Sequence, residues 1–448
     1  MFSLDIKQSL NPTIEKKAFY GEINTPFFLI QQILSIIPDH IYTKPNLKWL
    51  DPGCGCGYFT TVLYNKLYEG LKEAIPDEER RKKHIIQKMI YMVEIQEDNV
   101  KQLRTLFGKD ANIFHSDFLS WKSKHKFDII IGNPPYNSHG MKKVPTNHNL
   151  EKKQDGKTIW ISFVRCSIDL LRQNGHLCFI IPSIWMKPDK ARMYHYLTSY
   201  NIQKIHCFTN TETNKIFSGE AQTPTCYFLL KKRLNNDSVT LFDKQREKYI
   251  KYKLNPEYPI PLFGSHVISQ LMPFIEKAGY IKAYKTNTPS SKSHIVPISD
   301  DTHSYVNVKT CVLNGLKPQL IRNYSNIPLA YYNKKKLILA HKMYGFPYYD
   351  EEGIHGISNR DNYVITDYSD TELKRIQSFL STYFALYIYE TTRYRMKYLE
   401  KYAFQFLPDI TKLKDFPDTI TDESIADYFG LDNEDRENIY KLHQKKYF

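Results

Sequence analysis

Long hydrophobic runs are missing from this sequence. It has no run of about 18 or more uncharged apolar residues, the length that a membrane-spanning helix needs. Residues 1–7 contain no hydrophobic segment of the signal-peptide type. We therefore expect a soluble protein of the cytoplasm, with no membrane partner.

Cysteine is scarce, and its spacing argues against metal or redox chemistry. The seven cysteines form no Cys-x-x-Cys pair, and their odd number suits a reducing compartment. Cys54 and Cys56 are close together, but no histidine or second cysteine pair lies near them in the sequence to complete a ligand set. We expect no metal site.

Repeats of fixed period and low-complexity tails are also missing, and the charges are unbalanced. The chain has 62 Lys and Arg against 48 Asp and Glu, a formal net charge of +14 that favours a polyanionic partner. Its 34 tyrosines suit both packed cores and stacking on bases. A length of 448 residues predicts two or three domains.

The most informative segment is residues 128–136, an apolar run that ends in an amide, two prolines and an aromatic ring. Three consecutive β-branched residues at 129–131 are typical of a buried parallel strand. Ligands bind at the carboxyl ends of such strands. The tetrapeptide at that end consists of Asn133, Pro134, Pro135 and Tyr136.

This tetrapeptide suits attack by a planar, weakly nucleophilic amine. The side-chain oxygen of Asn133 and the carbonyl of Pro134 can accept its two N–H bonds and aim its lone pair. The prolines restrict the backbone, and Tyr136 offers a flat face on which a ring can stack. The alternative is a strand followed by an ordinary proline-rich turn.

A second motif predicts a strand, a glycine turn and a helix. Residues 47–50 read as a short strand, and a helical stretch covers about 60–71. Between them, glycines at 53, 55 and 57 allow close approach of a ligand to the backbone. The third glycine comes one residue too early for the dinucleotide fingerprint, so nicotinamide or flavin binding is the weaker interpretation.

A third element is the predicted strand at 89–93, which ends in Glu94. An acid at the end of the second strand can accept both hydroxyls of a ribose. The charged stretch 76–83 lies between the two motifs and reads as a solvated insertion rather than a site. Asp51 and Asp117 have a simpler alternative as helix or turn caps.

These motifs and their order resemble the S-adenosylmethionine-dependent amino-methyltransferases of DNA. The resemblance is to the gamma-class, type II restriction-modification-like group, whose cofactor motif precedes its catalytic motif, and it covers about half the chain. It implies an α/β, Rossmann-like class I methyltransferase fold with a mostly parallel seven-stranded sheet. The resemblance implies that S-adenosylmethionine is the methyl donor and that no metal is required. The Asn-Pro-Pro-Tyr motif implies that the methyl acceptor is the N6 amine of a flipped adenine.

The resemblance also assigns residues. Residues 18–26 look like the amino-terminal motif of the family, in which a Thr-Pro pair closes over the methionine end of the cofactor. The implied cofactor-binding residues are Thr25, Pro26, Asp51, Gly53, Gly55, Glu94, Asp117, Phe118, Asn133 and Pro135. The implied catalytic residues are Asn133, Pro134, Tyr136 and Phe217. Phe217 would supply a second aromatic for the base, although a core aromatic is an equal alternative.

Three regions are predicted along the chain. Residues 1–235 form the methyltransferase domain, 236–258 a linker, and 259–448 a mixed α/β DNA target-recognition domain with a carboxyl-terminal helical region. A helix-like span at about 371–401 ends in cations that could touch DNA, or could be an ordinary solvated face; they are Arg393, Arg395, Lys397 and Lys401. Residues 137–158 read as a mobile loop, with Lys142 and Lys143 as candidate phosphate contacts.

The sequence thus predicts site-specific N6-adenine methylation of duplex DNA. A cognate restriction endonuclease acting on the same site is a further candidate partner, and the oligomeric state is not predicted. One alternative is an RNA-base or protein-glutamine methyltransferase with the same pocket. Another, of a different class, is a non-catalytic DNA-binding subunit with a methyltransferase scaffold.

Overall fold

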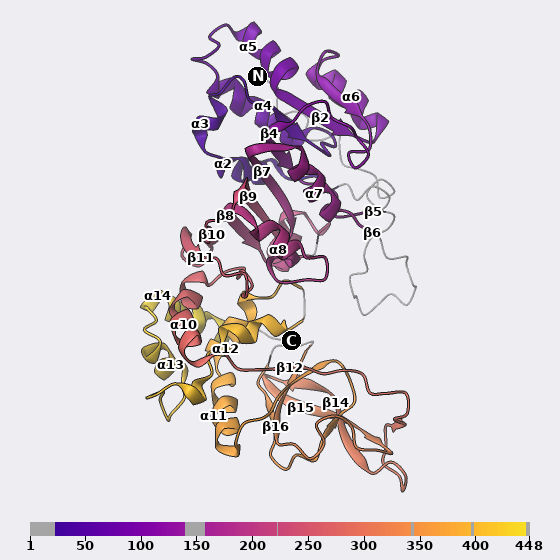
Figure 1. Cartoon of the computed structure of the whole chain (residues 1–448), viewed down its shortest axis with the longest axis vertical. Helices are drawn as coiled ribbons and strands as arrows, with labels where there is room; N and C mark the ends of the chain where they lie inside the picture. Colours follow the sequence, from indigo (N-terminus) through magenta and orange to yellow (C-terminus); the bar gives the residue numbers. More distant parts are fainter. Residues whose placement is uncertain (1–22, 139–156, 222, 342–344, 396–397, 445–448) are drawn as a thin grey trace. The chain divides into compact units, whose positions relative to one another are not determined.

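The structure is a computed structural model that describes residues 23–138, 157–221, 223–341, 345–395 and 398–444. It consists of two compact units, Met1–Phe242 and Asp243–Phe448 (Figure 1). The division falls inside segment 236–258, which the sequence assigns to a linker. Lys142, Lys143, Lys397 and residues 18–22 of the amino-terminal motif lie outside the described residues.

The first unit is built on a mostly parallel sheet with the strand order β10-β8-β9-β7-β4-β1-β2-β3. Strand β9 runs antiparallel to both of its neighbours, β7 and β8. The strands are β1 (Trp49–Asp51), β2 (Ile90–Glu94), β3 (Asn112–His115), β4 (Phe127–Gly132), β7 (Leu171–Pro182), β8 (Tyr200–Phe208), β9 (Thr225–Leu234) and β10 (Ser238–Asp243).

This sheet confirms the predicted α/β, Rossmann-like class I methyltransferase architecture. The chain moves outward from β1 through β2 to β3 and then returns to β4 on the other side of β1. The strand order therefore reverses between β1 and β4, and ligands bind at such a switch point. Strand β10 is an addition to the expected seven strands, and it comes from residues that the sequence assigns to the linker.

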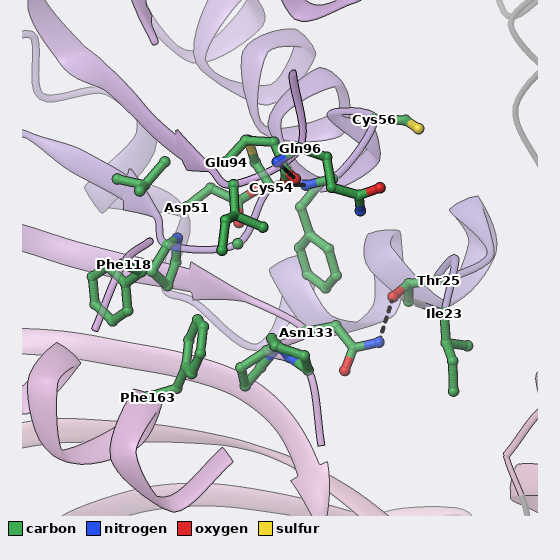
Figure 2. A pocket seen from close by; sticks show the side chains of 18 of the residues that line it. Ile23, Thr25, Asp51, Cys54, Cys56, Glu94, Gln96, Phe118, Asn133 and Phe163 are labelled. Atoms are coloured by element: carbon green, nitrogen blue, oxygen red, sulfur yellow. Dashed lines mark hydrogen bonds between the residues drawn. The ribbon is translucent and has the colours of Figure 1, made fainter. Parts of the chain in front are cut away.

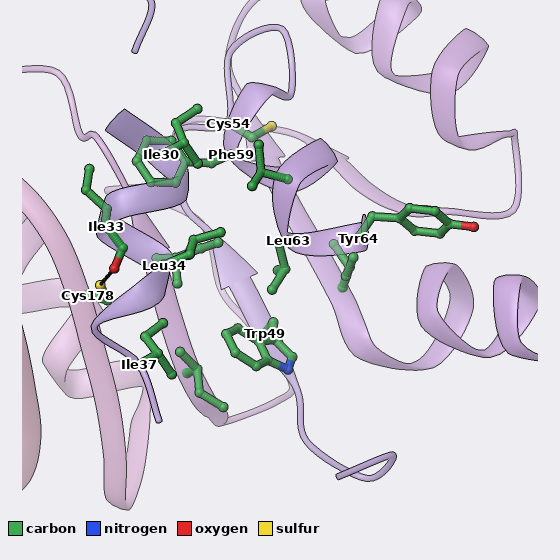
Figure 3. Packing of buried hydrophobic residues seen from close by; sticks show 14 of the residues in the cluster. Ile30, Ile33, Leu34, Ile37, Trp49, Cys54, Phe59, Leu63, Tyr64 and Cys178 are labelled. Carbon is green, nitrogen blue, oxygen red and sulfur yellow. Dashed lines mark hydrogen bonds between the residues drawn. The ribbon is translucent and has the colours of Figure 1, made fainter. Parts of the chain in front are cut away.

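Helices flank this sheet, and one buried core includes residues of four of them, at 27–35, 39–42, 58–70 and 97–107. The helices of the unit are α2 (Phe27–Ser35), α3 (Asp39–Tyr42), α4 (Tyr58–Gly70), α5 (Glu78–His84), α6 (Glu97–Phe107), α7 (Trp160–Leu170), α8 (Met193–Thr198) and α9 (Asn210–Ile216). Figure 3 shows Ile33 of α2, Leu63 of α4 and Trp49 of β1 in this core. All three side chains are fully buried, and burial of each aliphatic one stabilises the fold by about 1.5–3 kcal/mol.

The charged stretch 76–83 is largely exposed, as the sequence suggested, apart from Arg81. Most of it forms α5, whose first turn is capped by Asp77 through a bond from the Arg80 backbone N–H. Arg81 is 2% exposed; it donates to the carbonyl of Ile75 and lies 4.2 Å from the ring centroid of Tyr68. Stacking on Tyr68 and hydrogen bonds to backbone carbonyls offset the free-energy cost of burying the Arg81 charge. A charge pattern alone cannot reveal such contacts.

The second unit contains two four-stranded sheets and a set of helices. One sheet has the order β12-β19-β16-β17 and the other β13-β15-β14-β18. Strand β11 (Lys248–Lys253) belongs to neither of these sheets. Their strands are β12 (Tyr284–Lys285), β13 (Ile295–Val296), β14 (Tyr305–Asn314), β15 (Lys317–Ser325), β16 (Lys336–Ala340), β17 (Tyr348–Asp350), β18 (Gly356–Ile357) and β19 (Asn362–Ile365). The predicted mixed α/β character of this region is confirmed.

The prediction of a single helix at about 371–401 is wrong. The segment forms α11 (Asp370–Leu380) and α12 (Tyr383–Thr391), and the helices α10 (Ser265–Ala278), α13 (Asp422–Tyr428) and α14 (Asn433–Tyr440) complete the unit. Thr382 breaks the span because its side chain accepts from the Ala385 N–H and starts α12 as an N-cap. Arg393 and Arg395 lie beyond α12 and pair with Glu390 and Glu400.

Across the described segments of both units, no helix combines the length and the apolar character needed to cross a membrane.

Candidate functional site

A cavity of about 460 Å³ lies in the first unit at the carboxyl ends of β1, β2 and β4 (Figure 2). These are the strands beside the reversal of strand order. The predicted site residues that line it are Thr25, Asp51, Gly53, Gly55, Glu94, Asp117, Phe118, Asn133, Pro134, Pro135, Tyr136 and Phe217. Pro26 is not among the lining residues; it precedes α2, and its carbonyl accepts from the Ile30 N–H at 3.0 Å.

The glycine turn after β1 forms one wall of the cavity. The Cys54 N–H donates to the carbonyl of Val93 at 3.2 Å, and the Gly57 N–H donates to the carbonyl of Cys54 at 2.8 Å. Gly57 has φ of +85°, and an added Cβ would lie 2.7 Å from Cδ2 of Leu103. Gly53 faces Phe163, whose Cε1 would lie 3.5 Å from such a Cβ. A side chain at Gly53 would therefore fill space that a ligand can use.

Glu94 ties this turn to the end of β2. Its Oε2 accepts from the Gly55 N–H and its Oε1 accepts from the Gln96 N–H, both at 2.8 Å. The residue is 5% exposed and lines the cavity. These bonds hold a carboxylate at the place where a parallel sheet binds the ribose of a nucleotide.

Asp51 is a buried acid at the end of β1. Burial raises its pKa to about 7, the nearby Glu94 carboxylate adds to the rise, and hydrogen bonds from Thr60 and the Gly53 backbone oppose it. The Thr60 hydroxyl donates to Oδ2 at 3.1 Å. Asp51 therefore has a local hydrogen-bonding role, as the cap interpretation foresaw, and it also lines the cavity.

The charges of the cavity wall have one sign. The ionisable acids that line it are Asp51, Glu94 and Asp117, whereas its described lining includes no Lys, Arg or His. Such a wall attracts a cation and hydroxyl donors and repels a pyrophosphate. It fits a sulfonium nucleoside better than a dinucleotide, in agreement with the glycine spacing.

Asn133 follows β4 and presents an acceptor to the cavity. Its Nδ2 donates to the Thr25 hydroxyl oxygen at 3.0 Å, as the dashed line in Figure 2 shows. Its Oδ1 is buried and accepts no hydrogen bond from the described residues. A buried carbonyl oxygen without a donor costs about 1–3 kcal/mol, which a bound N–H group recovers. Thr25, 4% exposed, thus fixes which end of the amide faces the cavity.

Aromatic rings border two parts of the cavity. Phe118 and Phe163 have ring centroids 5.1 Å apart and lie on the side away from Thr25 (Figure 2). Tyr136 and Phe217 also line the cavity. Phe217 is 3% exposed and belongs to the hydrophobic core as well, so its stacking on a base stays a prediction. Burial raises the pKa of the Tyr136 phenol, whose oxygen has no partner among the described residues.

Some lining residues were missed from the sequence. Ile159 and Phe163 come from the first turns of α7, a helix whose apolar pattern looks like ordinary core. Only proximity in the fold separates these two residues from their many equivalents in the sequence. Asp117, which the sequence did assign to the site, accepts from the Leu119 N–H at 3.0 Å within its own turn and lines the cavity.

The two ends of the segment that follows the tetrapeptide pair with each other as a short β-ribbon. Strand β5 (Asn137–Ser138) pairs antiparallel with β6 (Lys157–Thr158), so the two ends of the expected loop meet beside the cavity. The Ile159 N–H donates to the Tyr136 carbonyl at 3.1 Å. Residues 139–156 lie outside the described residues.

The second unit holds a group with metal-ligand side chains, His266, Asp432 and Asp435. Arg246 already lies among them, with Nη2 at 2.6 Å from Oδ1 of Asp432 and from Oδ1 of Asp435. Its guanidinium supplies the positive charge that these acids require.

Comparison with known proteins identifies relatives of the first unit. The Eco57I restriction-modification methylase family matches residues 16–217. An uncharacterized adenine-specific methylase of Mycoplasma pneumoniae is 26% identical, covering 37% of this chain and 56% of the relative. Modification methylase CviBIII of Paramecium bursaria Chlorella virus NC1A is 28% identical, covering 45% of this chain and 49% of the relative.

The type II methyltransferase M.HindII of Haemophilus influenzae aligns over more of the chain. It is 22% identical, covering 88% of this chain and 70% of the relative. Among solved structures, the type IIG restriction endonuclease BpuSI has a TM-score of 0.43 at 12% identity, covering 93% of this chain and 64% of that one. The chain spans about half the length of the first-named curated relatives.

Proposed function

We propose that the protein is a site-specific DNA methyltransferase that transfers a methyl group from S-adenosylmethionine to the N6 amine of a flipped adenine; the match of residues 16–217 to the Eco57I restriction-modification methylase family supports this. The observation that carries this proposal is the buried, unpartnered Oδ1 of Asn133 in an acid-lined cavity. An amine donor satisfies that acceptor, and a sulfonium complements the surrounding carboxylates.

The described residues suit the cofactor. Glu94 would accept the ribose hydroxyls, and Phe118 and Phe163 would border its adenine. Gly53 and Gly55 both line the cavity, and their lack of side chains would let the methionine end lie close to the turn. When bound, the sulfonium supplies an electrophilic methyl group, so the protein itself needs no covalent nucleophile.

The target amine would be held by the tetrapeptide. Oδ1 of Asn133 and the carbonyl of Pro134 would each accept one N–H of the adenine amine, which aims its lone pair. Extruding the base costs a few kcal/mol. Stacking on Tyr136 and Phe217 would offset about 1–3 kcal/mol per stacked base.

The second unit would select the DNA sequence. The M.HindII alignment reaches into this unit, since it covers 88% of the chain. The excess of 62 Lys and Arg over 48 Asp and Glu suits a DNA partner. A restriction endonuclease with the same recognition sequence would be the corresponding partner enzyme.

Two alternatives make different predictions. A methyltransferase of RNA or of protein glutamine would use the same acceptors on another planar amine. A non-catalytic scaffold would bind DNA without turnover. The test is incubation of the protein with cofactor carrying a labelled methyl group and three separate acceptors: duplex DNA of diverse sequence, structured RNA, and a mixed protein extract. Label in DNA is expected, whereas label only in RNA or protein, or none, would overturn the proposal.

A further inference from the structure

A buried charge network lies between the sheets of the second unit, far in sequence from the catalytic motifs. Lys336 of β16 is 0% exposed, Asp350 of β17 2%, and His355 3%. Lys336 Nζ lies 2.5 Å from Oδ2 of Asp350, and Nδ1 of His355 lies 2.9 Å from Oδ1 of the same residue. The His355 backbone N–H also donates to Oδ2 of Asp350 at 3.1 Å.

Such a network is a costly way to hold two sheets together. Although burial alone would raise the pKa of Asp350, hydrogen bonds from His355 and Lys336 keep it below its usual range. Apolar side chains of similar volume commonly stabilise a core as well as a buried ion pair or better. The network is therefore better explained by what it positions than by the stability it adds.

The network ends at an exposed arginine. Arg322 of β15 is exposed, and its Nε donates to Nε2 of His355 at 3.2 Å. Since Nε2 accepts, the ring proton of His355 lies on Nδ1 and is donated to Asp350. The chain of contacts thus runs from Lys336 through Asp350 and His355 to the guanidinium. Its two terminal nitrogens make no hydrogen bond to the described residues.

We propose that Arg322 reads a guanine of the DNA target, with its two terminal nitrogens donating to O6 and N7 in the major groove. The proposal rests on the proposed function of the chain as a DNA methyltransferase. The bond from Nε fixes the plane of the guanidinium before DNA arrives, so less side-chain entropy is lost on binding. A phosphate contact needs only charge, whereas the paired acceptors of guanine need an oriented fork.

The experiment compares the wild type with Arg322→Ala, Arg322→Lys and the control Arg360→Ala. Arg360 is likewise an exposed arginine of this unit. Each purified full-length protein methylates a pool of duplexes of random sequence, and N6-methyladenine is mapped by sequencing. Cofactor binding and thermal unfolding are measured alongside.

Wild type and Arg360→Ala are expected to require a G·C pair at one position of the site. Arg322→Ala should lose that requirement and methylate the wild-type site roughly tenfold or more slowly. Cofactor binding should be unchanged, and the thermal midpoint should fall by a few degrees, because Nε2 of the buried His355 loses its donor. Arg322→Lys keeps a donor for guanine but loses the Nε bond that orients the fork, so it should restore the requirement only partly. An unaltered site preference in Arg322→Ala would overturn the guanine assignment, and full restoration by lysine would overturn the role of the oriented guanidinium. Absence of DNA methylation by the wild type would instead overturn the proposed function, and this inference with it.

Discussion

The hydroxyl of Thr25 is expected to set the rate of methyl transfer through Asn133. The two side chains come from segments 108 residues apart, and the 3.0 Å bond between them leaves Oδ1 of the amide facing the cavity. Thr25→Val keeps the shape of the side chain but removes this acceptor. The Nδ2 group then loses its partner, and the amide is free to rotate its donor end toward the target amine, which it would repel.

The expected fall in the rate of methyl transfer follows from the free energy of one buried hydrogen bond. Leaving a buried donor without its acceptor costs about 1–3 kcal/mol. If this orientation is needed for the reaction, the rate should fall roughly 5- to 150-fold, since about 1.4 kcal/mol corresponds to tenfold. Thr25→Ser, which keeps the hydroxyl, should retain most of the activity.

The assay is single-turnover methylation of a DNA substrate at saturating cofactor, with cofactor affinity measured separately by calorimetry. We expect a reduced rate and a cofactor Kd within about threefold of the wild type, less than 1 kcal/mol. A full rate in Thr25→Val would refute the orientation role. A loss confined to cofactor affinity would instead support direct binding of the cofactor by Thr25, as its sequence motif implies.

Three further predictions concern the same unit. Asn133→Ala should lose methylation by at least about 100-fold, with cofactor affinity measured by calorimetry almost unchanged; a matching loss of affinity would point to a collapsed pocket. Burial raises the pKa of Asp51 to about 7, so its charged form gains population as the pH rises. Cofactor affinity should therefore increase by about tenfold from pH 6 to 8. An equally steep pH dependence of cofactor affinity in Asp51→Asn would contradict this. Gly57→Ala should destabilise the fold in urea unfolding by more than the roughly 1–2 kcal/mol that a left-handed conformation costs an alanine, because the new Cβ would also lie 2.7 Å from Cδ2 of Leu103. A loss of only about 1–2 kcal/mol would show that Leu103 yields freely.

The sequence predicted most of the cavity because parallel strands place their carboxyl ends at one edge. Asp51, Glu94 and Asn133 each end or follow a strand, so locating the strands was enough to bring them together. The bond between Thr25 and Asn133 could not be foreseen in this way. It depends on how α2 packs against the sheet, which no local pattern specifies.

The errors have similar physical origins. Charge patterning correctly suggested a largely solvated stretch at 76–83, but it could not single out Arg81, which is buried against the ring of Tyr68. Apolar periodicity joined α11 and α12 into one helix, because periodicity does not register the N-cap at Thr382. The network that ends at Arg322 joins residues of three strands and a loop, and nothing in the linear pattern distinguishes Lys336 from an exposed lysine.

The central claim is that Asn133 presents an acceptor for the N6 amine of adenine in DNA. It is tested most directly by nucleoside mass spectrometry of duplex DNA incubated with cofactor and either the wild type or Asn133→Ala. We expect N6-methyladenine with the wild type and none above background with the variant, at equal cofactor occupancy. Methylation on another base, or an equal yield of N6-methyladenine from the variant, would contradict the account.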